Sequence, residues 1–498
     1  MNISRRRLLK LLGFGGLGFG GTQLMAFAAD MSAKRPPPNV VFIAVDDLRP
    51  QLGCYGESYM VTPNLDRFAR QGRLFKRHYV QVPICSPSRH ALLTGVRPHE
   101  DTTEFNDRAL RTLPRTITEH PHTMPELFKR SGYYTVAIGK IGHQPDGHIY
   151  NYDGSGKGRV EIPFAWDEVG TPVGQWRYGW AAFFAYANGR SRPNLPQEER
   201  APTEAADVSD TGYPDGLIAA AAVAKLQQLK QQQQDTAQPF FLGVGFYKPH
   251  LPFCAPKRYW DLYDRDRIPL SPAPAKPVNI NPHSWHDSHE IYRKYWVSPE
   301  TANTEAQQRQ LRHGYFAAVS YIDAQIGKVL RALDALRLSQ NTIVAIWGDH
   351  GWHLNDHAMW GKVTSYEWAT RSVFMMRTPR MRKRGRATNG IVESLDLYPT
   401  LAELCQLETP PGLGGTSLVP LLNNPSHPGK DRAFSYGHNG RTMRTDRYRI
   451  IRYPDGEPLI ELYDHQTDPY EKKNIASERP DIVEQLLPQL EADTPTLL

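Results

Sequence analysis

The chain has 498 residues, of which 40% are hydrophobic and 22% are charged. This composition is typical of a globular protein with one large domain and a smaller one. The formal net charge is +7, but Arg5, Arg6, Arg7 and Lys10 stand in a leader without acids and the remainder has no long basic run, so the charge does not indicate a nucleic acid partner.

The first 29 residues have the pattern of an export signal. Ser4 to Lys10 is basic, Leu11 to Met25 is an apolar stretch with several glycines, and Ala26-Phe27-Ala28 is a small-x-small cleavage site. The adjacent arginines resemble a twin-arginine signal, so we expect residues 1–29 to be removed and the mature protein to be exported to the periplasm. A membrane anchor is the alternative, although the run is short and only mildly apolar. No later stretch is long enough to cross a bilayer, so we expect no membrane span in the mature chain.

After Pro36-Pro37-Pro38 the predicted elements alternate between helices and strands. Strands are predicted at residues 39–45, 134–138, 240–246 and 342–347, because continuous apolar runs are typical of parallel strands buried on both faces. Helices are predicted at residues 63–72 and 123–132 and along the apolar stripe 316–333. Residues 154–174 and 270–282 are rich in glycine or proline and are predicted as long loops. The alternation predicts an α/β fold with a doubly wound sheet flanked by helices.

A second, smaller domain is predicted after a linker at residues 423–429. The boundaries are residues 36–424 for the large domain and residues 430–498 for a C-terminal α+β domain. The latter is predicted to contain short antiparallel strands at 448–453 and 459–463 and a final amphipathic helix from about residue 481.

Four of the predicted strands end in ionisable residues. Each such residue alone is more often a solvated or core side chain than a functional one. Ligands of open α/β sheets, however, bind beyond the carboxyl ends of the strands. We therefore expect one site formed by Asp46, Asp47, Lys140, His143, His250, Asp349 and His350.

The segment Cys85-Ser86-Pro87-Ser88-Arg89-His90-Ala91-Leu92-Leu93-Thr94-Gly95 places a thiol at the start of a predicted short helix. A helix start favours an anion, while a buried structural cysteine is the alternative. The four cysteines lie far apart without a CxxC pair, which indicates neither a zinc knuckle nor a disulfide framework, and one disulfide stays open.

This segment, continued by Leu93-Thr94-Gly95, resembles the signature of the type I sulfatase family. Gly132-Tyr133-Tyr134-Thr135 with Gly139-Lys140 and His143 is similar to the second signature of that family, and Glu461-Leu462-Tyr463-Asp464 with Asp468-Pro469 is similar to its C-terminal motif. Within the family the chain most resembles the iduronate-2-sulfatase subgroup, through Val45 to Pro50, Gly53 to Gly56, Tyr315 to Tyr321 and Asp349 to Trp352. The resemblance implies an alkaline-phosphatase-like fold with a mixed sheet.

The resemblance also implies that Cys85 is oxidised to Cα-formylglycine by a formylglycine-generating or an anaerobic sulfatase-maturating enzyme, which recognises Pro87 and Arg89. The aldehyde hydrates to a diol, one hydroxyl attacks sulfur, and the second then expels sulfate, so that no water has to attack the ester. A serine at this position could be sulfated but could not eliminate the sulfate.

Further roles implied by the resemblance follow the charges of the side chains. Asp46, Asp47, residue 85, Asp349 and His350 would hold Ca²⁺, with Mg²⁺ as the alternative. His350 is the weakest of these ligands, because imidazole binds calcium poorly. Arg89, Lys140 and Lys362 would stabilise the nucleophile and the sulfate, His143 would hold the second hydroxyl, and His250 would protonate the leaving alcohol.

The implied substrate is a sulfated saccharide, with the 2-O-sulfate of a terminal uronic acid as the specific expectation. A uronate adds a carboxylate, for which Arg49, Lys248 and Arg371 are candidate partners by their proximity in sequence to the site. Two alternatives stay open: a phosphonate or phosphate ester hydrolase of the same superfamily, and an exported glycan-binding protein without activity.

Overall fold

The computed structural model describes residues 36–98, 108–156, 158–298, 303–437 and 440–492. The predicted export signal at residues 1–29 lies outside these residues. The described chain from Pro38 onward forms one compact unit, and the predicted boundary between residues 424 and 430 stays a prediction. None of the described helices has the length and apolar character that a membrane crossing requires.

The central sheet is mixed and has nine strands in the described part of the chain. A parallel core of four neighbouring strands is continued at one end by β6, also parallel, and at the other end by strands of both directions. In spatial order the strands are β13 (Arg371–Ser372), β2 (Arg73–Tyr79), β14 (Phe374–Arg377), β10 (Thr342–Gly348), β1 (Asn39–Val45), β8 (Phe240–Phe246), β3 (Tyr134–Gly139) and β6 (Glu168–Val169), while β15 (Arg386–Glu393) pairs with β2.

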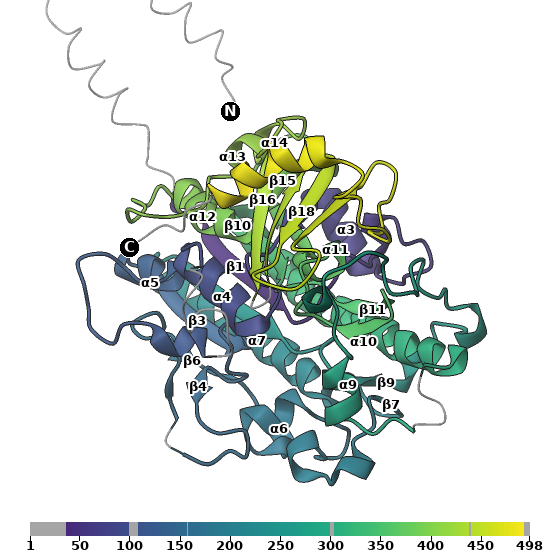
Figure 1. Cartoon of the computed structure of the whole chain (residues 1–498). Helices are drawn as coiled ribbons and strands as arrows, with labels where there is room; N and C mark the ends of the chain where they lie inside the picture. Colours follow the sequence, from purple (N-terminus) through teal and green to yellow (C-terminus); the bar gives the residue numbers. More distant parts are fainter. Residues whose placement is uncertain (1–35, 99–107, 157, 299–302, 438–439, 493–498) are drawn as a thin grey trace, which may run out of the picture. The chain divides into compact units, whose positions relative to one another are not determined.

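Helices cover both faces of this sheet, as Figure 1 shows. Along β1, Val41, Ile43 and Val45 pack into one apolar cluster and the alternate residues pack into a second cluster on the opposite face. The first cluster contains side chains of α3 (Pro63–Gln71), α7 (Pro214–Thr236) and α10 (Glu305–Ala335), and the second contains those of α4 (Cys85–Thr94), α5 (Met124–Arg130) and α12 (Leu397–Cys405). Burial on both faces explains why these strands are continuous apolar runs, and the predicted α/β fold is confirmed.

The register of the sheet brings the carboxyl ends of its parallel strands together. Val45 at the end of β1 pairs with Gly348 of β10 and with Phe246 of β8, and Gly139 of β3 pairs with Gly245 of β8. Gly139 has a φ of +79°, and a Cβ there would lie 1.9 Å from the carbonyl oxygen of Gly245. Only glycine allows this approach, and it sets the point at which Lys140 leaves the strand.

Two parts of the sheet differ from the sequence-based prediction. β2, β14 and β15 carry charged side chains and were not predicted; in β2, Arg73 is fully buried because its guanidinium donates to the carbonyls of Arg386 and Leu422. Residues 154–174, predicted as a loop, include β6, which pairs with β3.

The C-terminal part contains a four-stranded antiparallel sheet with α14 (Pro480–Glu491) packed on it (Figure 1). Its strands are β16 (Arg432–Gly437), β17 (Gly440–Thr445), β18 (Tyr448–Arg452) and β19 (Ile460–Asp464). The predicted C-terminal antiparallel sheet and helix are confirmed, with two more strands than the sequence indicated. All four cysteines are free.

The remaining α-helices and strands of the described chain are short. They are β4 (His148–Ile149), β5 (Arg159–Val160), α6 (Gly179–Phe183), β7 (Thr203–Ala206), β9 (Phe253–Pro256), α8 (Lys257–Trp260), α9 (His289–Lys294), β11 (His353–Asp356), β12 (Met359–Gly361), α11 (Glu367–Thr370) and α13 (Val419–Asn423). Six of them form separate two-stranded sheets: β4 with β5, β7 with β9 and β11 with β12.

Candidate active site

Cys85 is the first residue of α4, and its sulfur is surrounded by polar groups from three other segments. Sγ lies 3.3 Å from Asp46 Oδ1, 3.3 Å from His350 Nε2 and 3.2 Å from Lys362 Nζ. Asp46 follows β1, His350 follows β10, and Lys362 follows β12. All four residues are buried. The structure therefore brings Lys362, which lies 277 positions after Cys85 in the sequence, and the two strand ends to one point at the sheet edge.

The two aspartates after β1 both face this point because the backbone turns between them. The Asp46 amide still donates to Phe246, at 3.3 Å, as a strand residue would. Asp47 adopts φ +56°, a left-handed conformation that aspartate tolerates better than most residues. Its amide donates to Asp349 Oδ1 at 2.9 Å, which ties the ends of β1 and β10 together.

Arg89, one helical turn after Cys85, connects the ends of β1 and β10 through Asp46 and Asp349. Its Nε lies 3.0 Å from Asp349 Oδ2 and its Nη2 lies 3.3 Å from Asp46 Oδ2. Nη1 donates to the carbonyls of Lys140 and Ile141. The side chain is fully buried, and a planar guanidinium with several donors suits this bridging position.

His350 presents a lone pair to the site. Its Nδ1 lies 2.9 Å from the carbonyl oxygen of Gly351, which can only accept, so the proton resides on Nδ1. Burial lowers the pKa of His350 to about 4, which keeps the ring neutral near pH 7. Nε2 then faces Cys85, Asp47 and Asp349 as an acceptor or a metal ligand.

The carboxylates form a cluster that suits a divalent cation. Asp46, Cys85, Asp349 and His350 offer ligand atoms within 4.8 Å of one another, as do Asp46, Asp47, Cys85 and His250. Burial, reinforced by Asp46 and Asp349 and opposed by Lys362, raises the pKa of Asp47 well above its ordinary value. Asp47 Oδ2 is buried without a hydrogen-bond partner in the described part of the chain. Hard oxygen donors in this state fit Ca²⁺ or Mg²⁺, since a cation would relieve both the repulsion and the missing bond.

Cations of the chain complete the charge balance around Asp46 and Asp47. Burial works to raise the pKa of Asp46, but Lys140 and Arg89 outweigh it and hold that pKa well below its ordinary value. Lys140 pairs with Asp46, and Lys362 Nζ lies 2.7 Å from Asp47 Oδ1. These contacts raise the pKa of both lysines against the effect of burial, so each carries a positive charge at the site.

The thiol of Cys85 is not activated by its position at a helix start. Burial, with the added charge of Asp46, raises its pKa well above the ordinary value, which leaves the sulfur protonated. The thiolate, which is the nucleophilic form of cysteine, is therefore disfavoured at this position. For a modified residue 85, Sγ stands in for the oxygen atoms of a hydrated aldehyde.

His143 and His250 lie further out, on the wall of a cavity of about 240 Å³ above Cys85. His143 packs against Trp180, with ring centroids 5.4 Å apart. His250 Nδ1 lies 2.7 Å from the Leu251 carbonyl and Nε2 lies 3.6 Å from Glu290. Burial lowers the pKa of His250 well below its ordinary value, which favours the neutral ring even though Nε2 lies near Glu290 and Asp47.

The cavity is also lined by residues that the sequence did not single out. They lie on irregular segments and short helices, for which neither periodicity nor a motif gives a signal. The aromatic ones are Tyr152, Trp180, Phe183 and Phe184, and the charged or polar ones are Arg192, His289, Glu290 and Lys294. The cavity thus combines an aromatic wall with two cations at its rim.

The three cations proposed from sequence proximity do not line this cavity. Lys248 is fully buried and donates to the carbonyl of His250 at 2.9 Å. Arg49 pairs with Asp356 at 2.6 Å, and Arg371 lines a different pocket together with Arg49. The expectation that one of them binds a substrate carboxylate beside Cys85 is therefore wrong.

Comparisons with known proteins agree with this geometry. Residues 38–407 match the family model described as "Sulfatase". The iduronate 2-sulfatase of Mus musculus is 34% identical over 414 residues, covering 77% of this chain and 71% of that protein. The chain belongs to the sulfatase family. It is a sulfuric ester hydrolase. Residues 350–494 of this sulfatase also match the family model described as "N-sulphoglucosamine sulphohydrolase, C-terminal".

Solved structures share the fold of this sulfatase. A 2-O GAG sulfatase aligns with a TM-score of 0.65 at 23% identity, over 91% of each chain. A phosphonate monoester hydrolase from Silicibacter pomeroyi aligns with a TM-score of 0.69 at 21% identity, over 91% of this chain and 94% of that one. Sulfatases in general use a formylglycine and a divalent metal, and the groups around Cys85 are candidates to hold such an ion.

Proposed function

We propose that this sulfatase hydrolyses the 2-O-sulfate of a terminal uronic acid in sulfated glycans, with Cys85 converted to formylglycine and one divalent metal ion beside it. The observation that carries the proposal is the position of Cys85. Its side chain is buried among three carboxylates and two lysines, and it lines a cavity of about 240 Å³. A small, cation-lined cavity of this kind suits one anionic sugar residue.

Formylglycine at position 85 would supply the nucleophilic oxygen, and a divalent ion held by Asp46, Asp47, Asp349 and His350 would supply positive charge for that oxygen and for sulfate. Lys362 lies 3.2 Å from Cys85 Sγ, Lys140 pairs with Asp46, and both line the cavity together with Cys85; the two lysines would neutralise the non-bridging sulfate oxygens. Since both lysines are already fixed by ion pairs, little reorganisation is needed when negative charge develops.

Proton transfer would involve the two histidines of the cavity wall. His143, next to Trp180, would hold the second hydroxyl of the hydrated residue 85. His250 Nε2 faces the cavity, and an anionic ester beside it favours the protonated ring. His250 could then protonate the leaving alcohol, while Nδ1 stays bonded to the Leu251 carbonyl.

We propose Arg192 and Lys294 as the groups that bind the uronate carboxylate. Arg192 packs on Phe184, with its guanidinium carbon 3.3 Å from the ring centroid, and donates to Tyr295 at 3.2 Å. This contact fixes the planar group at the cavity rim, where it can bind a carboxylate with two hydrogen bonds. The aromatic wall beside it would support the sugar ring.

The test is desulfation of a substrate panel by the purified mature protein. We expect 2-O-sulfated uronate disaccharides to be turned over much faster than 6-O-sulfated hexosamine or choline sulfate. Arg192→Gln should lower kcat/KM for the uronate substrate about 10-fold or more, the effect of losing a charged hydrogen bond, and should leave aryl sulfate turnover nearly unchanged. Arg190→Gln, on the same segment but exposed and paired with Glu199, is the matched control. Equal or faster turnover of 6-O-sulfated hexosamine would contradict the substrate and leave the sulfatase assignment intact.

Phosphonate or phosphate ester hydrolysis is the second candidate, because phosphonate monoester hydrolases share this fold. In the described residues, the two candidate ligand groups at the site share Asp46 and Cys85, which suits one ion rather than a pair. A ratio of kcat/KM for an aryl sulfate over a phenyl phosphonate well above one is expected, and the opposite ratio would favour the second candidate.

A further inference from the structure

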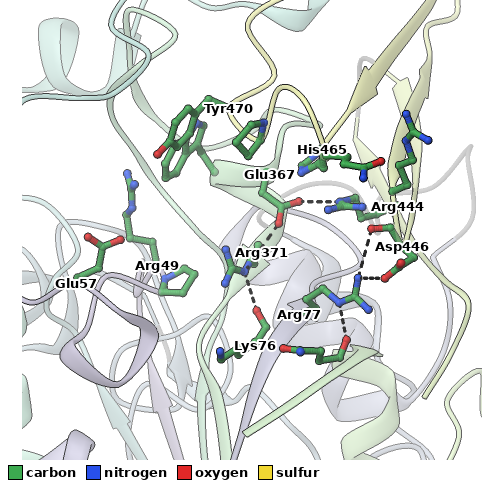
Figure 2. A pocket seen from close by; sticks show the side chains of 16 residues that line it. Arg49, Glu57, Lys76, Arg77, Glu367, Arg371, Arg444, Asp446, His465 and Tyr470 are labelled. Carbon is green, nitrogen blue, oxygen red and sulfur yellow. Dashed lines mark hydrogen bonds and ion pairs between the residues drawn. The ribbon is translucent and has the colours of Figure 1, made fainter. Parts of the chain in front are cut away.

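A second, larger pocket lies apart from the Cys85 cavity. It has a volume of about 680 Å³ and shares no lining residue with that cavity. Figure 2 shows that its side chains come from several elements: Arg49 after β1, Lys76 and Arg77 of β2, Arg371 of β13, and the C-terminal part of the chain. The C-terminal contribution consists of Arg444, Asp446, Arg447, His465, Gln466, Pro469 and Tyr470.

The charge of this pocket is predominantly positive. Its lining contains six lysine or arginine side chains and three acidic ones, Glu57, Glu367 and Asp446. Most of the cations are engaged: Arg77 pairs with Asp446 and Arg444 with Glu367, as Figure 2 shows, while Arg49 and Arg447 pair with Asp356 and Asp464.

Two cations in the pocket are less completely neutralised. The ion pair of Arg371 with Glu367 is long and shares that carboxylate with Arg444. Lys76 is exposed, and its ammonium group has no ion pair or hydrogen bond in the described part of the chain. Arg371 donates through Nε to the Lys76 carbonyl at 2.8 Å, and its nearest carboxylate, on Glu367, is 3.9 Å from that atom. The Nε bond fixes the guanidinium beside Lys76 and leaves its two terminal nitrogens as donors. The guanidinium of Arg371 is thus held in place, and it and the exposed ammonium group of Lys76 have donors left for an anionic ligand.

An aromatic wall lies in the same pocket. Trp368 and Tyr470 stack with their planes 4° apart and their centroids separated by 6.0 Å, and the Arg49 guanidinium lies 4.2 Å from the Trp368 ring. Tyr470 is 37% exposed, although aromatic side chains are usually more deeply buried. Flat aromatic and guanidinium surfaces next to charged donors suit a ring-shaped ligand that carries anionic groups, and less so a small ion.

We propose that this pocket is a non-catalytic binding site for a carboxylate- or sulfate-bearing saccharide, separate from the site of hydrolysis. Lys76 and Arg371 bind an anionic substituent, and Tyr470 with Trp368 supports a sugar ring. The proposal rests on the proposed function in that the same class of glycan is the substrate. The pocket has room for more than the one sugar residue that the Cys85 cavity holds, so it serves to retain a longer glycan on the enzyme.

The first test is binding of a fluorescent heparin-derived octasaccharide to the full mature chain in a Cys85→Ala background, where no turnover occurs. The double variant Lys76→Gln with Arg371→Gln is expected to bind about 10-fold more weakly and with a smaller dependence on salt. Lys257→Gln with Arg337→Gln removes the same charge from exposed positions outside the pocket and should leave affinity unchanged. Unchanged affinity in the pocket variant, or an equal loss in the control pair, would overturn the proposal.

A second variant separates saccharide binding from general attraction of polyanions. Tyr470→Ala should weaken octasaccharide binding several-fold and have no effect on inorganic polyphosphate, because it removes the ring surface and no charge. If polyphosphate binds the pocket as tightly as the octasaccharide and Tyr470→Ala changes neither, the site is not one for saccharides. Melting curves of each variant show that the fold is retained.

Turnover measurements show whether the saccharide bound in the pocket belongs to the same glycan that is hydrolysed at residue 85 or to a separate one. With Cys85 present, kcat/KM for a sulfated disaccharide should be the same in the pocket variant and in the parent protein. A lower kcat/KM for the octasaccharide alone indicates that one chain reaches both sites, and an unchanged value with weaker binding indicates a separate chain. Because binding is measured without turnover, absence of sulfatase activity would contradict the proposed function and not the pocket.

Discussion

Residue 85 combines features that a simple cysteine nucleophile would not need. Its thiol is buried with a raised pKa, and its neighbours are two lysines, an arginine and three carboxylates rather than a single base. This environment is suited to an uncharged precursor side chain that gains oxygen atoms before it acts. The surrounding charges therefore agree better with the proposed conversion of Cys85 to formylglycine than with a thiol nucleophile.

We therefore predict that Cys85 carries an aldehyde in active protein. Peptide mass spectrometry should show sulfur replaced by oxygen and two hydrogens lost at position 85, which distinguishes the aldehyde from a serine. Cys85→Ser should accumulate a stable sulfate ester on the serine and show no turnover, because the second hydroxyl is missing, whereas Cys85→Ala should hold no sulfate. Full activity in protein with only an unmodified thiol at this position would contradict the prediction.

Asp349 connects two parts of the site, since it accepts from the Asp47 amide and pairs with Arg89. Asp349→Asn should lower both metal occupancy, measured by elemental analysis, and activity, the latter about 100-fold or more. Asp323→Asn is the control: Asp323 is also buried and accepts amide hydrogen bonds from Asn64 and Leu65, so it should cost stability without metal loss. Full metal content in Asp349→Asn would remove Asp349 from the ligands.

At the scale of elements, the C-terminal sheet is joined to the central part by buried ion pairs. Arg449 of β18 bonds to Glu471 at 2.5 Å, to Glu367 of α11 at 2.7 Å and to the Ser365 carbonyl at 2.9 Å. Its guanidinium is fully buried together with Glu471, and Glu367 is partly buried, so the charges of this cluster depend on one another for compensation.

Arg449→Ala should therefore destabilise the fold by about 3–5 kcal/mol, because it removes the arginine from the buried Glu471 and leaves Glu367 with Arg444 as its nearest cation. Arg452→Ala, on the same strand but exposed and paired with Glu491, should change stability by less than about 1 kcal/mol. Denaturant unfolding of both variants measures the difference. Similar midpoints for the two variants would show that the buried cluster does not hold these elements together.

At the scale of the whole molecule, Glu461 of β19 links the C-terminal sheet to the loop before α9. It accepts from the Asn281 amide at 2.7 Å and from the Tyr463 hydroxyl at 2.8 Å. Burial raises its pKa from 4.5 to about 7, against the hydrogen bond from Asn281. Because the folded carboxyl holds its proton more tightly than the unfolded one, the contribution of Glu461 to stability is greatest below pH 4.5, falls as the pH rises to about 7, and is constant above it.

Glu461→Gln should remove this dependence. We expect the free energy of unfolding of the parent, relative to the variant, to decrease between pH 5 and pH 8 by at most about 3 kcal/mol. Glu491→Gln, at an exposed position, should follow the parent across this range. A constant difference between the parent and Glu461→Gln would show that the carboxyl does not titrate in this window.

The sequence alone determined the parallel core of the fold and the cluster around Cys85. Strands buried on both faces must be apolar throughout, so β1, β3, β8 and β10 were visible as continuous runs, and their register places the polar residues that follow them at one edge. β2 was not predicted from the sequence, because its buried Arg73 breaks the apolar pattern. The Arg73 guanidinium donates to backbone carbonyls of distant segments, and these contacts leave no signal in the local sequence.

Only the tertiary structure decided which cations line the cavity and which lie elsewhere. Arg49 stands two residues after Asp47, yet its guanidinium packs on Trp368 and pairs with Asp356, since successive side chains after a strand point in different directions. Arg192 and Lys294 lie more than 100 residues from Cys85 and reach its cavity through irregular segments. Proximity in sequence identifies the strand ends because the sheet register is regular, whereas the surrounding loops are placed only by packing of the complete chain.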